Sequence, residues 1–155
     1  MKAWLWERYG PPEVLRLADV AKPTAKSGEV LLKVEAASVN AADWRSMRGR
    51  PLFSRLTLGV LRPKHSSLGV DVAGRIEALG DGVTTPEPGS EVYANLLDHG
   101  YGGFAEYVAV PVGVMGSKPG NLSFEEAAAT LKAEVSHCAP NSVGPKLTWA
   151  NANRE

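Results

Sequence analysis

The most constraining feature of this chain is a series of short apolar runs, each ended by glycine, proline or another turn-forming residue. β-Branched and aromatic residues recur within these runs, and several alternate with polar residues, which is typical of β-strands. Such short strands with frequent turn signals predict an all-β barrel or sandwich. The expected strands cover residues 1–6, 14–20, 29–39 and 68–80, with one strand after the turn at 81–90 and one or two within 102–119.

Two helices are also predicted. Ser123 and Glu126 form the sequence pattern of a capping box, so a helix is expected over residues 123–135. A shorter helix is expected near residues 41–48, with Asn40 as its N-cap. Residues 51–67 fit neither periodicity, and we interpret them as a loop with a helical turn.

Length and charge limit the functional classes. The 155 residues predict one domain with a substantial core. Seventeen basic and seventeen acidic residues give zero formal net charge, so neither a nucleic-acid nor a membrane partner is expected. Two local basic clusters, Arg45–Arg48–Arg50 and Arg55–Arg62–Lys64, are interpreted as solvated surface, with an anion site as the alternative.

Cysteine content and hydropathy suggest an intracellular location. Cys138 is the single cysteine, which excludes an intramolecular disulfide framework, and the adjacent His137 and Cys138 have no further ligands nearby for a metal. No secretory signal pattern or span-length apolar run is present, so the expected location is the cytoplasm.

Five stretches occur in an order typical of a known family. They are "GEVLLKVEAASVNAADWRSMRG", "LGVDVAGRIEALGDGV", "PGSEVYA", "GGFAEYVAV" and "KPGNLSFEEAAA". Together they resemble the N-terminal, GroES-like domain of the medium-chain dehydrogenase/reductase superfamily over residues 1 to about 129. The greatest similarity is to the zinc-free quinone oxidoreductase and enoyl reductase-like branch. The resemblance implies a mainly β fold, a GroES-like β-barrel with a few short helices, over residues 1–135.

Two positions point to the zinc-free branch. Zinc-dependent members of the family have cysteine where this chain has Asn40, and Gly-His-Glu where it has Gly69, Val70 and Asp71. Loss of the thiolate and the imidazole removes the ligands that a catalytic zinc needs, so no metal is expected.

The resemblance also implies site residues. Asn40 is expected near the nicotinamide of NADP or NAD, and Trp44, Met47 and Asp71 are expected to contribute to the substrate site. A structural alternative stays open for each residue. Asn40, supported by Asp43, is then only a helix cap. Trp44 and Met47 would pack in the barrel, and Asp71 would be a satisfied core or rim carboxylate. The sequence identifies no catalytic residue.

A cofactor-binding turn is not recognisable. Gly100, Gly102 and Ala105 match G-x-G-x-x-A, but a strand-like run follows them, whereas a dinucleotide turn must open a helix. Residues 136–155 do not resemble the family's continuation and are expected to form a flexible tail. We therefore expect no tight binding of NADP or NAD by this chain, and association through the surface that would face a Rossmann domain, including part of the helix at 123–135.

Three functional hypotheses remain from the sequence. The chain is the substrate-side half of a zinc-independent reductase of quinones, enones or carbonyl compounds, truncated before the Rossmann domain and inactive alone. Alternatively, it is a standalone β-barrel that binds a small molecule or a partner without catalysis. The third hypothesis is an enzyme that a second chain completes.

Overall fold

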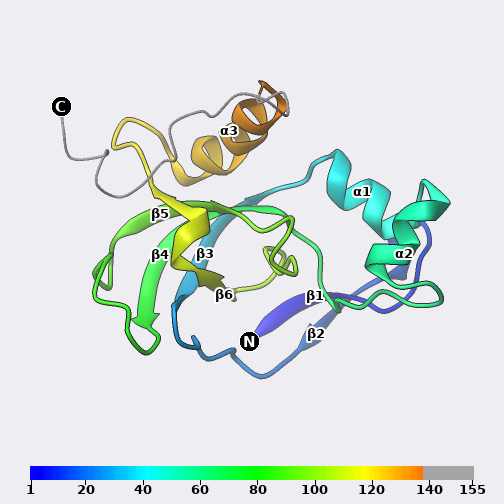
Figure 1. Cartoon of the computed structure of the whole chain (residues 1–155), viewed down its shortest axis with the longest axis horizontal. Helices are drawn as coiled ribbons and strands as arrows, with labels where there is room; N and C mark the ends of the chain where they lie inside the picture. Colours follow the sequence, from blue (N-terminus) through cyan, green and yellow to red (C-terminus); the bar gives the residue numbers. More distant parts are fainter. Residues whose placement is uncertain (138–155) are drawn as a thin grey trace.

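The computed structural model describes the backbone of residues 1–137 and the side chains of residues 1–130, so most of the tail predicted at 136–155 lies outside the described residues. Seven strands and three helices make up the fold (Figure 1). The strands are β1 (Lys2–Trp6), β2 (Leu15–Asp19), β3 (Glu29–Ser38), β4 (Asp71–Leu79), β5 (Glu91–Asn95), β6 (Tyr107–Pro111) and β7 (Met115–Ser117). The helices are α1 (Ala41–Arg48), α2 (Arg55–Leu58) and α3 (Phe124–His137), with single 3₁₀ turns at Pro12–Val14, Leu52–Ser54 and Val112–Val114.

Antiparallel pairing organises the strands into two sheets. The larger sheet has the order β6-β3-β4-β5-β7, and β1 pairs with β2 in a separate two-stranded ribbon. Single bridges from Ala3 to Ala105 and from Leu5 to Ser67 connect the ribbon to the segments that precede β6 and β4. The mainly β prediction and all the expected strands are therefore confirmed, although β4 begins at Asp71, three residues later than predicted.

The main core lies on one face of the larger sheet. Alternate residues of its strands turn inward, as the period of two requires. Val30 and Leu32 of β3, Val72 of β4, Val92 of β5 and Val110 of β6 are inaccessible to solvent. The pairing between β3 and β4 shifts register at Leu31/Leu32 and at Val34/Ala36, and such irregularities bend a strand.

A second core fixes α1 against the ribbon. Trp6, Met47, Leu68, Val70 and Tyr101 form this buried cluster, to which β1, α1 and two loops contribute. The indole Nε1 of Trp6 donates to the carbonyl of Met47 at 3.3 Å. This contact satisfies the one polar atom of a fully buried tryptophan and positions the C-terminal half of α1.

Helix α3 packs across the larger sheet, away from α1 (Figure 1). Ala127 and Ala128 lie against Ala73 of β4, and these small side chains permit a close approach between helix and sheet. The predicted capping box is present: the backbone N–H of Glu126 donates to Ser123 Oγ at 3.1 Å, and that of Ser123 donates to Glu126 Oε2 at 2.8 Å.

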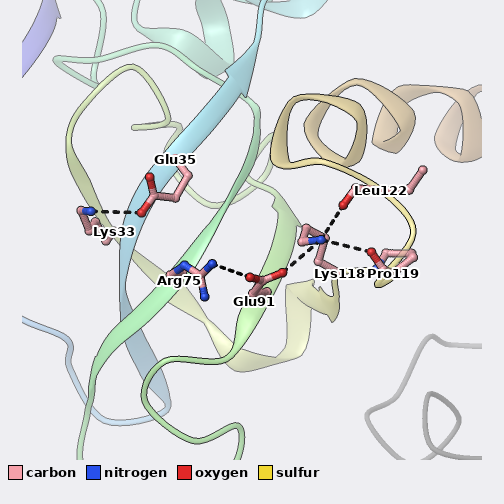
Figure 2. Close-up of polar contacts among 7 residues, drawn as sticks. All are labelled: Lys33, Glu35, Arg75, Glu91, Lys118, Pro119 and Leu122. Carbon is pink, nitrogen blue, oxygen red and sulfur yellow. Dashed lines mark hydrogen bonds and ion pairs between the residues drawn. The ribbon is translucent and has the colours of Figure 1, made fainter.

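A buried lysine ties β7 to α3. The side chain of Lys118 is 5% exposed, and its ammonium group lies 3.0 Å from Glu91 Oε2. It also donates to the carbonyls of Pro119 and Leu122, while Arg75 pairs with the other oxygen of Glu91 (Figure 2). Lys118 thus joins strand β5 to the turn that leads into α3.

Within the described residues, no helix is both long enough and apolar enough to cross a membrane.

Candidate functional site

Asn40 begins α1 and is a helix cap, as the sequence predicts. Its side-chain Oδ1 accepts from the backbone N–H of Ala42 at 2.8 Å. In return, Asp43 Oδ2 accepts from the backbone N–H of Asn40 at 3.1 Å. Two of the N–H groups that a helix start leaves unpaired are thereby satisfied.

The remaining side of the Asn40 amide contacts Asp71. Asn40 Nδ2 donates to Asp71 Oδ2 at 2.8 Å, and Asn95 Nδ2 donates to Asp71 Oδ1 at 2.5 Å. Asp71 and Asn95 are directly opposite each other in the pairing of β4 with β5. The buried Asp71 carboxylate therefore joins the start of α1 to the ends of two strands.

Both amides are oriented by the backbone. Asn40 Oδ1 accepts from Ala42, and Asn95 Oδ1 accepts from the backbone N–H of Leu97 at 3.2 Å. Each Nδ2 must consequently face Asp71, so both carboxylate oxygens of Asp71 are required as acceptors.

Asp43 is a second buried carboxylate beside this network. Its Oδ1 accepts from the backbone N–H of Gly69 at 2.9 Å. Burial raises the pKa of Asp43 and the nearby Asp71 adds to the rise, while the backbone N–H groups of Asn40 and Gly69 oppose it. Gly69 itself has φ of +98°, and a Cβ there would lie 2.6 Å from the backbone of Gly103. This close approach accounts for glycine at the position.

The composition of the network bears on metal binding. Among the described residues, no three His, Cys, Asp or Glu side chains come together in a way that could hold a metal ion. Val70, which occupies the expected histidine position, is buried in the second core. Asp43 and Asp71 both use their oxygens to accept the hydrogen bonds given above. The network is therefore a carboxylate–amide cluster, which suits orientation of neighbouring polar groups.

A cavity of about 510 Å³ lies beside α1, between α2 and the loop after β5. Ser46 and Tyr101 contribute hydroxyl groups to its lining, and their oxygens are 3.0 Å apart. His65 also lines it, with its ring centroid 5.7 Å from that of Tyr101. Tyr101 has φ of +64°, a left-handed conformation that is uncommon outside glycine and is found more often at functional sites.

The expected substrate residues do not line this cavity. Trp44 is 48% exposed, with the guanidinium of Arg48 4.5 Å from its ring centroid. Met47 packs in the second core, and Asp71 accepts the two amides described above. Their substrate roles stay predictions.

The sequence did not predict Asn95, Ser46 or Tyr101 as site residues. Knowledge of the register between β4 and β5 would have identified Asn95, which is opposite Asp71. No local sequence motif marks Ser46 or Tyr101.

Comparison with known families agrees with this architecture. The model of the alcohol dehydrogenase GroES-like domain matches residues 26–120. The chain belongs to this family. The GroES-like fold predicted from the sequence is mainly β, with the strands and short helices described above.

Relatives of this GroES-like chain are oxidoreductases. It is 37% identical over 136 residues to 2-methylene-furan-3-one reductase of Solanum lycopersicum, covering 83% of this chain and 34% of that protein. It is 35% identical to the chloroplastic NADPH-dependent alkenal/one oxidoreductase of Arabidopsis thaliana, covering 83% and 33%. The chain thus spans about a third of the length of these curated relatives.

Solved structures give the same result for the GroES-like chain. The quinone oxidoreductase of Coxiella burnetii superposes with a TM-score of 0.72 at 31% identity, over 83% of this chain and 40% of that one. The quinone oxidoreductase of Thermus thermophilus, also solved in complex with NADPH, is 38% identical with a TM-score of 0.62, over 83% and 36%.

Proposed function

We propose that these residues form the substrate-side domain of a zinc-independent NAD(P)H-dependent oxidoreductase that reduces a quinone, an enone or a related carbonyl compound. The activities named for the relatives from Solanum, Arabidopsis and Coxiella support this class. A cytoplasmic location is part of the same proposal, whereas the Arabidopsis relative is a chloroplast protein.

The Asn40–Asp71–Asn95 network is the observation that carries the proposal. Asn40 and Asp71 of this network lie at positions where zinc-dependent members of the superfamily are expected to hold their metal. In this chain an amide and a buried valine replace the two best ligands, and each oxygen of the Asp71 carboxylate accepts from an amide. Protein dialysed after purification should therefore contain far less than one zinc per chain by atomic emission, and one retained zinc per chain would contradict the proposal.

Asn40 is the residue that fits a nicotinamide. Its side chain keeps a second N–H on Nδ2 and a second lone pair on Oδ1 beyond the contacts it makes, and the residue is half-buried. These groups suit the carboxamide of the nicotinamide. The cofactor, when bound, supplies the hydride. The described residues offer no glycine-rich turn between a strand and a helix for the pyrophosphate, because residues 100–105 lead into strand β6.

The Ser46–Tyr101 pair suits the oxygen of a carbonyl substrate. When Ser46 donates to the Tyr101 oxygen, the Tyr101 O–H is left to donate into the cavity. A hydrogen bond to the carbonyl oxygen polarises an enone and stabilises the negative charge that develops there as the double bond is reduced. Ser46 is six residues along α1 from Asn40, about 9 Å at the helical rise.

An enone of low reactivity, isophorone, provides the test. Titration followed by amide NMR shifts should perturb Ser46, His65 and Tyr101, and Tyr101→Phe should weaken binding several-fold. Tyr107→Phe, which removes a hydroxyl from strand β6, is the matched control and should leave binding unchanged. Shifts spread evenly over the surface, or equal binding by the two variants, would contradict the assignment of the cavity.

A ligand-binding module without catalysis is a second candidate. A mostly apolar cavity of about 550 Å³ lies between the ribbon and β3, lined by Trp4, Leu15, Val39 and Phe104 among others. Tight binding of an apolar ligand there, with no shifts around Tyr101, would favour this candidate over a reductase domain.

A further inference from the structure

Three arginines converge on one cavity at the C-terminal end of α1. Arg48, Arg50 and Arg55 line a space of about 330 Å³ together with Tyr9, Gly10 and Pro11. The lining contains no carboxylate. Within the described part of the chain, none of the three guanidinium groups forms an ion pair. The sequence alone favours solvated surface for these residues, because it does not show that they share a cavity.

Arg55 is held in place by neutral groups. Its Nε donates to the carbonyl of Gly49 at 3.2 Å, and its guanidinium lies 4.4 Å from the ring centroid of Tyr9. The Tyr9 hydroxyl is in turn anchored by donation to the carbonyl of Gly59 at 2.5 Å. These contacts fix the plane of the guanidinium and use only one of its five N–H donors.

Arg48 and Arg50 complete the cluster. Arg48 stacks over Trp44, and its position in the last turn of α1 also suits the negative end of the helix dipole. Arg50 is exposed, and no hydrogen bond or ion pair from its side chain is observed within residues 1–130. The helix end therefore accounts for Arg48, and packing accounts for Arg55, but neither accounts for Arg50.

A neighbouring cavity shows the opposite arrangement. Arg8, Arg16 and Arg62 line it, but Glu7 and Glu13 line it too, and Arg16 pairs with Glu7 at 3.3 Å. The two carboxylates of that cavity offset two of its three positive charges. The cavity around Arg50 has three positive charges and no carboxylate in its lining, which is the arrangement that binds a multiply charged anion.

We propose that Arg48, Arg50 and Arg55 form a binding site for a phosphate group, either free phosphate or a phosphomonoester carried by a larger molecule. Planar guanidinium groups match phosphate oxygens in a bidentate manner, and a phosphate dianion would neutralise most of the cluster charge. The site goes beyond the proposed reductase function. It lies at the end of α1 opposite Asn40, about 12 Å along an eight-residue helix.

Calorimetric titration of the chain at about 0.15 M salt tests this site. The first probe is inorganic phosphate and the second is hexyl phosphate, whose short apolar tail mimics a carried phosphomonoester. We expect saturable one-to-one binding, weakened about tenfold or more by Arg50→Gln, because one bidentate charge-assisted contact is lost. Arg62→Gln removes one charge from the neighbouring cavity and should change affinity less than twofold.

Each outcome bears on the proposal. Equal affinity for both probes assigns the site to phosphate itself, and tighter binding of hexyl phosphate assigns it to a carried phosphomonoester. Absence of saturable binding by either probe, or equal weakening by Arg50→Gln and Arg62→Gln, would overturn the site. Since Arg50 is exposed, its variant should melt at the wild-type temperature, which separates lost binding from lost folding.

Discussion

At the scale of single residues, the Asp71 carboxylate decides how the candidate site is ordered. Asn40 and Asn95 each present an N–H to it, and each amide is prevented from turning over by a backbone N–H on its oxygen. Asp71→Asn would place an amide N–H against one of these donors inside a buried site. We expect a loss of about 1.5–3 kcal/mol in the free energy of unfolding, measured in urea. Asp98→Asn, on the exposed loop after β5, should change it by less than about 0.5 kcal/mol, and equal stabilities would refute the role of Asp71.

The other buried carboxylate, Asp43, predicts a pH effect. Burial raises its folded-state pKa above the ordinary value of 3.8, so the native state retains the proton to higher pH than the unfolded chain. The stability that the native state gains by retaining this proton is fully present below pH 3.8. It is lost as pH rises through the folded-state pKa of Asp43. The unfolding free energy of wild type minus that of Asp43→Asn should therefore fall from about pH 4 upwards and then level off. A difference that rises or stays flat in urea titrations would contradict the raised pKa.

At the scale of elements, local signals were sufficient for most of the fold. The Ser123–Glu126 capping box located the start of α3, and alternation with turn residues located the strands, because both depend on neighbours in sequence. The Asp71–Asn95 contact depends instead on the register of β4 with β5, and the Ser46–Tyr101 contact on packing of a loop against α1. Such long-range pairings leave no local pattern, so Asn95, Ser46 and Tyr101 were not predicted.

The attachment of α3 depends on Lys118. Its ammonium group donates to the carbonyls of Pro119 and Leu122 inside the turn that precedes the helix (Figure 2). Lys118→Met removes these charge-assisted bonds while keeping most of the apolar stem, and should cost about 1.5–3 kcal/mol. Hydrogen exchange should quicken first at the amides of residues 124–130. Lys26→Met, at an exposed lysine, is the control, and unchanged exchange in Lys118→Met would show that the helix is held by apolar packing alone.

At the scale of the whole molecule, much of the exposed apolar surface lies in one region of the chain. Leu52, Phe53, Leu56, Val60 and Leu61 are between 61% and 90% exposed. These five residues belong to the segment around α2, which lies beside α1 at one end of the molecule (Figure 1). The described outer face of α3, in contrast, carries Glu125, Glu126, Ala129 and Thr130, and the association expected there stays a prediction.

The apolar segment around α2 predicts association. Light scattering should show dimers or larger species as concentration rises, since exposed apolar clusters favour contact between molecules. Phe53→Ser combined with Leu56→Ser should reduce association markedly. Leu17→Ser combined with Val39→Ser removes two exposed apolar side chains elsewhere and should have less effect. A wild-type chain that stays monomeric at high concentration would contradict this expectation.

Titration of the 155-residue chain with NADPH is the most direct test of the proposed function, in which the chain provides the substrate side of a reductase and residues 1–137 offer no pyrophosphate site. Calorimetry should give no dissociation constant in the micromolar range, because Asn40 would reach only the nicotinamide end of the cofactor and orientation of the cofactor requires further anchorage. Weak binding that Arg50→Gln abolishes, and that NADH does not show, would belong to the phosphate site. Micromolar binding of NADPH that survives in Arg50→Gln, accompanied by oxidation of NADPH with an enone, would contradict the proposed function.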